Sequence, residues 1–316
     1  MENYAASNPQ YTRRAATKLL AMAGAGAFTG LPLFAGSNPK PMLQRKIPGT
    51  GELLPAVGLG TWQTFDVGTS ETARAPLQEV LRQFAALGGK LIDSSPMYGN
   101  SEVVVGDLAA ALNIPRKLFM ATKVWTQGRQ AGVAQMDTSM REMRRQPMDL
   151  MQIHNLLDWR THLATLRQWQ AEKKFRYIGI THYLVSAFDD LEKIMRTEKI
   201  DFVQLNYNIA TRAAADRLLP LAQDKNIAVI VNRPFESGSL FSAVKNKPLP
   251  GWAAEFDCNS WGQFFLKYIL AHPAITCVIP ATAKVKHLTD NMQAGLGRLP
   301  DAALRKQMEA YVKNII

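Results

Sequence analysis

Residues 150–206 read LMQIHNLLDWRTHLATLRQWQAEKKFRYIGITHYLVSAFDDLEKIMRTEKIDFVQLN. Three short runs rich in apolar and β-branched residues predict strands at Leu150–His154, Arg176–Thr181 and Phe202–Asn206. The intervals carry amphipathic helical patterns at Trp159–Glu172 and Phe188–Arg196. Strands that alternate with helices pair in parallel through right-handed crossovers, so this stretch predicts an α/β fold.

The alternation continues on both sides of this stretch. Further candidate strands are Val57–Thr61, Lys90–Asp93, Leu118–Lys123, Ala228–Asn232 and Thr276–Pro280. Further helical patterns are Pro76–Leu87, Gln130–Arg145 and Ala213–Asp224. Eight βα units within about 240 residues favour a closed (β/α)8 barrel, the TIM barrel. An open doubly wound sheet is the alternative, but the G-x-G-x-x-G turn that usually follows its first strand is absent here.

Three segments fall outside the alternating units. Met42–Leu54, with a turn at residues 48–51, predicts a hairpin that we place across the bottom of the barrel. Arg233–Ser260, after the seventh strand, is a long irregular segment, and loops of such length are usually functional. The chain closes with a predicted helix at Asp301–Ile315.

The N-terminal segment predicts an export signal. Arg13 and Arg14 precede Lys18, Leu19 and a moderately apolar stretch that reaches Ser37, which is the layout of a twin-arginine signal. An amphipathic or barrel-capping helix is the alternative. We therefore expect a targeting segment at residues 1–37 and a barrel domain at residues 38–316. We also expect the twin-arginine export machinery as a partner and a periplasmic or otherwise exported protein. No later run of about 18 apolar residues predicts a membrane span.

The composition is that of a globular enzyme. Hydrophobic residues make up 47% and charged residues 20% of the 316 positions. The net charge of +11 comes from Lys and Arg spread among Asp and Glu, without a dense basic run interleaved with aromatics, so we expect no nucleic-acid partner. The two cysteines, Cys258 and Cys277, lack metal-ligand spacing, so we expect neither a disulfide framework nor a metal site.

Reactive side chains follow three successive predicted strands. Asp93 ends the second strand, Lys123 the third and His154 the fourth, and Tyr98 lies five residues after Asp93. Strand ends meet at one face of a barrel, so these four groups should converge. A tyrosine hydroxyl with a pKa of about 10 is a poor proton donor, and a nearby ammonium lowers that pKa. Asp93 would keep the ammonium charged, and a neutral His154 would hydrogen-bond a substrate oxygen.

The stretch Leu91–Glu102, followed by Gly106, resembles the signature of the aldo-keto reductases, and so does Gly58–Trp62 at the first strand. The resemblance extends from about Met42 to Asn291 and indicates an exported bacterial-type member of that family. It implies that Asp93, Tyr98, Lys123 and His154 form the family's catalytic tetrad, with Tyr98 as general acid in reduction and general base in oxidation.

The resemblance also implies a nicotinamide dinucleotide bound without a Rossmann domain. The residues expected to hold it are Gly60, Thr61, Trp62, Thr181, His182, Gln204, Asn232, Arg233, Phe235, Gly238, Thr282, Lys284, His287, Asp290 and Asn291. Two positions depart from the family pattern, because His182 replaces the usual Asn and Asn232 stands where many members stack an aromatic ring on the nicotinamide. Lys284 and Lys286 beside His287 favour NADP(H) over NAD(H), and the alternative is that they are solvated surface lysines.

The resulting hypothesis is an NAD(P)H-dependent oxidoreductase that interconverts a carbonyl and an alcohol. Trp62, Trp125 and the Arg233–Ser260 segment, with Trp252 as a further candidate, are expected to wall the substrate. These aromatics favour an apolar or ring-bearing carbonyl, and the alternative is that they only pack the loops. A cofactor-binding redox sensor or interaction subunit with little turnover is the alternative on the same barrel, favoured by the two departures and disfavoured by the intact tetrad. A barrel hydrolase or isomerase is a third and more remote reading.

Overall fold

A computed structural model describes residues 41–315, and the expected twin-arginine segment at residues 1–37 lies outside the described residues. Eight parallel strands pair in sequence order. They are β3 (Leu59–Gly60), β4 (Leu91–Asp93), β5 (Phe119–Val124), β6 (Met148–His154), β7 (Phe175–His182), β8 (Phe202–Asn206), β9 (Ala228–Asn232) and β10 (Ile275–Val278). Bridges from Val57 to Val278 and from Gly60 to Ala281 join the first strand to the last. The predicted (β/α)8 barrel is confirmed.

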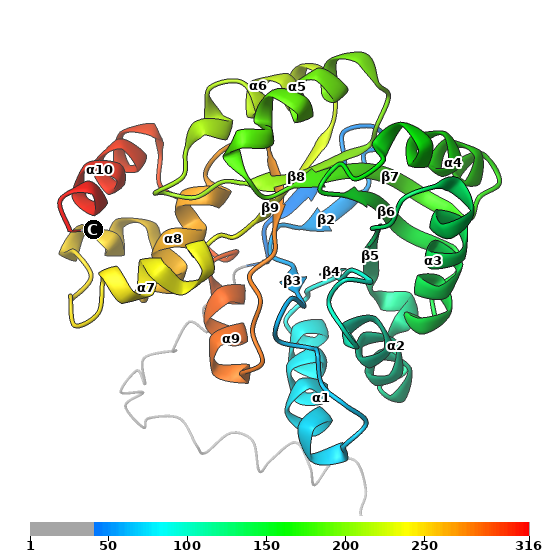
Figure 1. Ribbon diagram of the computed structural model, residues 1–316. Coiled ribbons are helices and arrows are strands. Elements are labelled where there is room, and N and C mark those ends of the chain that lie inside the picture. Colours follow the sequence, from blue (N-terminus) through cyan, green and yellow to red (C-terminus); the bar gives the residue numbers. More distant parts are fainter. Residues whose placement is uncertain (1–40, 316) are drawn as a thin grey trace, which may run out of the picture. The chain divides into compact units, whose positions relative to one another are not determined.

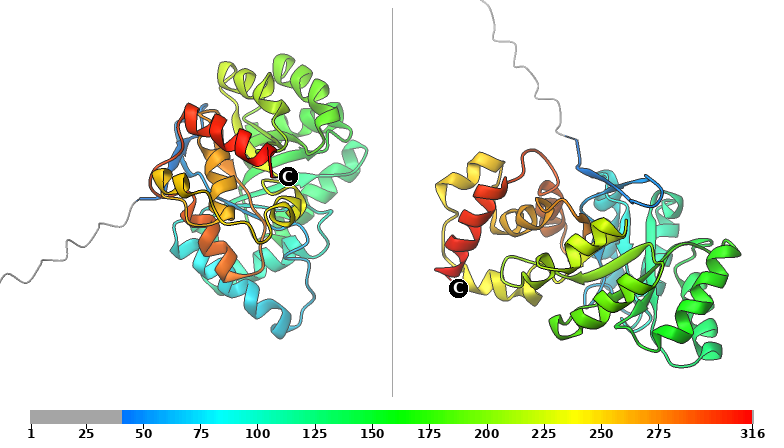
Figure 2. Two further views of the ribbon diagram at one scale, coloured as in Figure 1. Left: turned by 90° about the vertical axis from the view of Figure 1, so that its left-hand side faces the viewer. Right: turned by 90° about the horizontal axis from the view of Figure 1, so that it is seen from above.

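Helices surround the strands on the outside of the barrel (Figures 1 and 2). They are α1 (Glu71–Ala86), α2 (Ser101–Ala111), α3 (Arg129–Glu142), α4 (Trp159–Ala171), α5 (Phe188–Thr197), α6 (Leu218–Asp224), α7 (Ser239–Ala243), α8 (Trp261–Leu270), α9 (Val285–Gln293) and α10 (Ala302–Lys313). Short 3₁₀ turns occur at Pro115–Lys117, Val185–Ala187, Ala213–Ala215, Glu236–Gly238 and Gly251–Phe256.

Three predicted segments differ from the structure. The helix predicted from Pro76 begins at Glu71, so that Pro76 lies inside it. The helix predicted from Ala213 begins as an α-helix only at Leu218, so that Pro220 falls in its first turn, where the missing N–H costs no helical hydrogen bond. The segment predicted as irregular, Arg233–Ser260, carries α7 and two 3₁₀ turns. Its Pro, Gly and Asn residues separate these turns rather than preventing them.

The pleat of the strands explains the two cores of the barrel. Alternate residues such as Ile92, Met120 and Met151 point outward and pack with the helices in one large cluster. Their neighbours Leu91 and Phe119 point inward and belong to a separate inner cluster. Because side chains alternate across a strand, each strand supplies both cores from one short run.

The N-terminal hairpin closes the bottom of the barrel, as predicted. It consists of β1 (Gln44–Lys46) and β2 (Leu53–Pro55), which pair antiparallel. Ile47 and Leu54 of the hairpin are buried in the inner cluster of the barrel. In the right-hand view of Figure 2 the hairpin lies on the side opposite α7. The open mouth is therefore the C-terminal end of the strands. Among residues 41–315, no helix is long and apolar enough to cross a membrane.

Candidate active site

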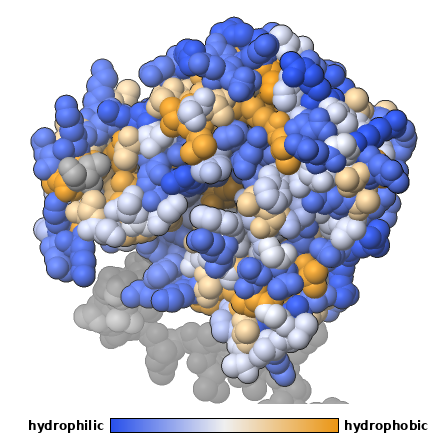
Figure 3. Space-filling view, in the orientation of Figure 1, coloured by the Kyte–Doolittle hydropathy of each residue, from blue (hydrophilic) through white to orange (hydrophobic). Residues whose placement is uncertain are grey.

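A cavity of about 790 Å³ opens at the C-terminal ends of the strands. Figure 3 shows this face of the molecule hollowed near its centre. Of the residues predicted from the sequence, those that line the cavity are Gly60, Thr61, Trp62, Asp93, Tyr98, Trp125, His154, Thr181, Gln204, Asn232, Arg233, Phe235 and Gly238. The strand ends thus bring together most of the predicted site, as the barrel geometry requires.

A buried ion pair forms the floor of the cavity. Lys123 Nζ donates to Asp93 Oδ2 at 2.7 Å and to the carbonyl oxygen of Ser94 at 2.6 Å. The other carboxylate oxygen, Asp93 Oδ1, accepts from Gln152 Nε2 at 3.0 Å and from Gln204 Nε2 at 2.8 Å. Both charged side chains are almost wholly enclosed. A buried pair is stable only when its remaining lone pairs and protons are satisfied, and this network satisfies them.

The pKa of Lys123 lies above its ordinary value. Burial alone would lower the pKa, but the attraction of the Asp93 carboxylate and of Tyr98 outweighs burial. Lys123 is therefore a permanent ammonium group just beneath the cavity.

Tyr98 lies beside this ammonium. Lys123 Nζ is 4.9 Å from the centre of the Tyr98 ring. Burial raises the pKa of Tyr98 above its ordinary value, and the pull of Lys123 in the other direction is smaller. The expected net lowering by the ammonium is therefore not found, because desolvation of the phenolate dominates. Tyr98 holds its proton at neutral pH and can donate it.

His154 stands at the edge of the Tyr98 ring. The two ring centres are 5.7 Å apart and the planes are nearly perpendicular. His154 Nδ1 lies 2.9 Å from Ser95 Oγ, and the hydroxyl is itself buried. Burial, assisted by the charge of Lys123 and by His182, lowers the pKa of His154 to about 2. The imidazole is therefore neutral, as the sequence led us to expect.

A cluster of amides borders the cavity. Gln204 Oε1 accepts from Thr181 Oγ1 at 3.3 Å and from Asn232 Nδ2 at 3.4 Å. Asn232 Oδ1 is buried and has no hydrogen-bond partner among residues 41–315. A buried acceptor without a partner is costly. An amide N–H of a ligand would satisfy it, so these residues fit the carboxamide of a nicotinamide ring.

The rim after β9 has a strained backbone. Arg233, Glu236 and Ser237 have φ angles of 49°, 46° and 53°, in the left-handed region that side chains disfavour. Arg233 Nη2 lies 3.2 Å from Glu236 Oε2, so the guanidinium already has a carboxylate partner. The other oxygen, Glu236 Oε1, accepts from Asn206, Asn208 and Thr211. Arg233, Phe235 and Gly238 all line the cavity, and the Arg233 guanidinium is bound there by Glu236 of the same loop.

Several predicted cofactor residues do not line the cavity: His182, Thr282, Lys284, His287, Asp290 and Asn291. The His182 ring binds the backbone of the loop that follows it: its Nδ1 accepts from the backbone N–H of Leu184 at 3.1 Å. Asp290 holds the start of α8, because its two oxygens accept from Ser260 Oγ at 2.6 Å and from Gln263 Nε2 at 2.7 Å. The cofactor roles assigned to these residues stay predictions.

The cavity lining also includes residues from the segment expected to be functional after the seventh strand and from the segment after the eighth: Pro234, Ser237, Phe241, Ile279 and Ala281. Further lining residues were not predicted: Gln63, Thr64, Met97, Asn155 and Tyr183. Gln152 and Ser95 were also missed, although both bind predicted site residues. Gln152 could have been found, since it lies two residues before His154 and therefore points to the same side of β6.

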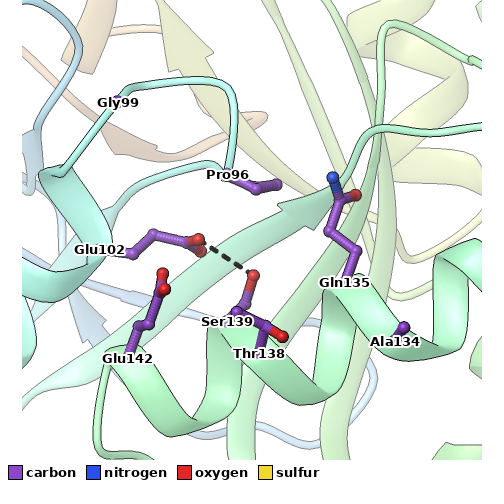
Figure 4. A pocket seen from close by; sticks show the side chains of 8 residues that line it. All are labelled: Pro96, Gly99, Glu102, Ala134, Gln135, Thr138, Ser139 and Glu142. Atoms are coloured by element: carbon purple, nitrogen blue, oxygen red, sulfur yellow. Dashed lines mark hydrogen bonds between the residues drawn. The ribbon is translucent and has the colours of Figure 1, made fainter.

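A second cavity, of about 410 Å³, lies outside the barrel behind the loop that carries Tyr98 (Figure 4). Glu102 of α2 is buried there and accepts from Thr122 Oγ1 and, at 3.0 Å, from Ser139 Oγ. Glu142 of α3 turns its carboxyl group toward Glu102 (Figure 4). Burial raises the pKa of Glu102 to about 7, against the lowering effect of the two hydroxyl donors. No cation among residues 41–315 contacts this carboxyl, and Glu102 does not line the larger cavity.

Comparison with known proteins assigns the barrel to a family. The sequence model of the Aldo/keto reductase family matches residues 56–311. Methylglyoxal reductase YeaE of Escherichia coli is 26% identical over 278 residues, covering 85% of this chain and 96% of the relative. The NADH-specific methylglyoxal reductase of the same organism is 30% identical over 243 residues, covering 66% of this chain and 73% of the relative.

Solved structures agree on the fold. An aldo/keto reductase from Klebsiella pneumoniae, in complex with NADP and acetate, superposes with a TM-score of 0.71 at 21% identity. The match covers 84% of this chain and 94% of the Klebsiella chain.

Proposed function

Because the chain belongs to the aldo/keto reductase family, we propose that it reduces a carbonyl compound to an alcohol with NAD(P)H, with Tyr98 as the proton donor. The family makes the protein a carbonyl oxidoreductase in general terms. The observation that carries the finer proposal is the buried Asp93–Lys123 pair directly beneath a protonated Tyr98 at the floor of the cavity. A structural ion pair would not need a titratable hydroxyl and a neutral histidine at the same opening.

The proposed chemistry adds a hydride and a proton across a C=O bond. A nicotinamide dinucleotide, held at Thr181, Gln204 and Asn232, would supply the hydride for the carbonyl carbon. Tyr98 gives its hydroxyl proton to the carbonyl oxygen, and Lys123 stabilises the phenolate that remains. Asp93 keeps Lys123 charged and in place through the 2.7 Å contact. His154, which is neutral, can hydrogen-bond the same oxygen and stabilise its developing charge.

The chain's own residues fit a nicotinamide at the amide cluster. Thr181, Gln204 and Asn232 would hold the carboxamide, and the unpartnered Asn232 Oδ1 would accept its N–H. For the far end of the dinucleotide we propose Lys284, Lys286 and His287, which are exposed at the start of α9. Two lysines near a helix N-terminus favour a phosphate, and therefore NADP(H). One relative was solved with NADP and another is named NADH-specific, so both cofactors belong in the test.

The rim of the cavity favours a substrate with an apolar body. Trp62, Trp125, Tyr183 and Phe241 line the opening, yet each leaves about two-fifths or more of its surface exposed: 46%, 40%, 39% and 41%. Exposed aromatic side chains gathered around one opening are typical of a ligand surface. We therefore propose that the enzyme prefers ring-bearing or aliphatic carbonyls to methylglyoxal. Methylglyoxal is the compact dicarbonyl that appears in the names of two relatives.

Export by the twin-arginine route remains part of the proposal. That route carries folded proteins, so the enzyme could leave the cytoplasm with its dinucleotide already bound. The check is to isolate the protein from the periplasm and to assay released nucleotide. Recovery in the cytoplasm alone, with residues 1–37 intact, would contradict the export proposal.

The function is tested by titrating the full chain with NADPH and NADH, followed by fluorescence, beside turnover of aromatic, aliphatic and dicarbonyl substrates. We expect binding of NADPH and turnover that Tyr98→Phe lowers by at least about 100-fold while leaving cofactor affinity intact. Binding without turnover in the unaltered protein would instead favour a redox sensor or interaction subunit. Absence of binding would contradict the cofactor site, with Asn232 and His182 as the first positions to restore.

A further inference from the structure

Ser95 is buried in the loop after β4 and meets the imidazole of His154. Its Oγ lies 2.9 Å from His154 Nδ1 and also accepts, at 3.3 Å, from the backbone N–H of Met97. Ser95 is wholly enclosed, and His154 is 5% exposed at the cavity. The contact therefore occurs away from bulk water, where the direction of a hydrogen bond has consequences.

The hydrogens of this contact can be assigned by counting donors and acceptors. The oxygen of Ser95 already accepts from Met97, and within residues 41–315 the one acceptor bonded to its hydroxyl hydrogen is His154 Nδ1. If Nδ1 accepts, the single hydrogen of a neutral imidazole must be on Nε2. The reverse arrangement would leave a buried hydroxyl hydrogen without an acceptor.

The opposite nitrogen is free to meet a substrate. His154 Nε2 makes no hydrogen bond with residues 41–315, and it is not among their enclosed unpartnered atoms. Tyr98 and Trp125 flank the ring at 5.7 Å and 6.3 Å between ring centres. With Nδ1 bound to Ser95 and Nε2 not enclosed, Nε2 is the ring nitrogen available to the cavity that His154 lines.

We propose that Ser95 is a positioning residue that fixes His154 in the tautomer with hydrogen on Nε2. This inference rests on the proposed function, since the Nε2 hydrogen is the donor that a carbonyl oxygen needs. In the other tautomer Nε2 presents a lone pair to that oxygen and repels it. Ser95 therefore acts on the reaction through His154 and does not touch the substrate.

The direct test is ¹⁵N NMR of the full chain with labelled histidine, because protonated and unprotonated imidazole nitrogens resonate far apart. His154→Gln assigns the signal among the five histidines. We expect the proton on Nε2 in the unaltered protein and a mixture of tautomers in Ser95→Ala. Ser95→Thr keeps a hydroxyl and should restore the single tautomer. Ser139→Ala is the matched control, since it removes a buried serine hydroxyl that binds Glu102 instead.

Kinetics supply the second readout. Ser95→Ala should lower kcat by at least about tenfold with unchanged cofactor affinity, Ser95→Thr should recover most of the loss, and Ser139→Ala should leave kcat as it is. A proton on Nδ1 in the unaltered protein overturns the proposal, and so does a Ser95→Ala variant with an unchanged tautomer. If the unaltered protein shows no turnover, the proposed function fails while the NMR result still decides the tautomer.

Discussion

Two buried carboxyl groups lie on opposite sides of β5. Lys123 points into the barrel and pairs with Asp93, whereas its neighbour Thr122 points outward and binds Glu102. Asp93 receives an ammonium and two amide donors, whereas Glu102 receives two hydroxyl donors from residues 41–315. Burial raises the pKa of Glu102 to about 7, and the neighbouring Glu142 carboxylate adds to the rise.

The comparison shows what a cation in contact adds to a buried carboxyl. Hydroxyl donors satisfy the lone pairs of Glu102, but they do not offset the cost of removing its charge from water. Since Lys123 and Thr122 are consecutive residues, the pleat of one strand separates a charged cluster at the cavity from a carboxyl that can take up a proton.

The largest effect is expected from removing the cation. Lys123→Met should lower the free energy of unfolding by about 3–5 kcal/mol, because the Asp93 carboxylate stays buried without its partner. Urea denaturation monitored by tryptophan fluorescence measures the change. The double variant Asp93→Asn/Lys123→Met removes both charges and should recover part of the loss. A double variant less stable than Lys123→Met would contradict this account.

Glu102→Gln should change how stability depends on pH. With a pKa of about 7 in the folded protein and an ordinary value of 4.5, Glu102 holds its proton better when folded. Unfolding therefore releases a proton between these values, and stability falls as the pH rises through that window. The variant lacks this titrating group. Between pH 5 and pH 8 its free energy of unfolding should therefore rise by up to about 3 kcal/mol relative to that of the unaltered protein. Parallel pH profiles for the two proteins would show that Glu102 is ionised throughout.

Ser139→Ala removes one of the two hydroxyl donors to Glu102. The free energy of unfolding should fall by about 1 kcal/mol at pH 8, where the carboxylate needs the donor, and by less at pH 5. The pKa of Glu102 should rise further, which a carboxyl-labelled NMR titration would follow. A loss as large at pH 5 as at pH 8 would assign the effect to packing instead.

The smallest effect is expected at a partly exposed carboxylate on the same helix. Asp107 of α2 pairs with Arg74 at 2.8 Å and with Arg144, and the Arg144 side chain is 56% exposed. Arg144→Ala should cost less than about 1 kcal/mol, since solvent screens the pair. The cost should shrink further in high salt when measured by urea denaturation. A loss of stability close to that of Lys123→Met would mean that burial does not explain the difference between Asp93 and Asp107.

Spacing along the chain predicted the floor of the cavity well. Asp93, Lys123 and His154 lie at the ends of successive parallel strands. Parallel strands in a closed barrel all end at the same face, so these residues come together whatever the details of the loops. Because side chains alternate along a strand, the sequence alone also indicates that Lys123 and Thr122 point to opposite sides of β5. Ser95 was not predicted because its role depends on the course of a loop, which places the hydroxyl against a residue 59 positions later.

Loops limited the prediction of the rim. His182 was expected to hold the cofactor, yet the next residues turn so that Leu184 donates to its ring nitrogen. Tyr183 was not predicted, because no periodic pattern fixes the direction of a side chain in the loop after β7. Phe241 lies in α7, a helix of five residues within the Arg233–Ser260 segment that the sequence predicted to be irregular. Asp290 matched the family pattern by position, and the structure adds its bonds to Ser260 and Gln263.

The hairpin under the barrel has a consequence for the exchange of protons with solvent. Within residues 41–315, Ile47 and Leu54 pack into the inner cluster at the lower end of the barrel, whereas Asp93 of the buried pair borders the cavity at the upper opening. A molecule that fills the opening would isolate the pair from bulk solvent. Hydrogen–deuterium exchange at the Lys123 ammonium would then slow on ligand binding, even with a ligand that never contacts the lysine.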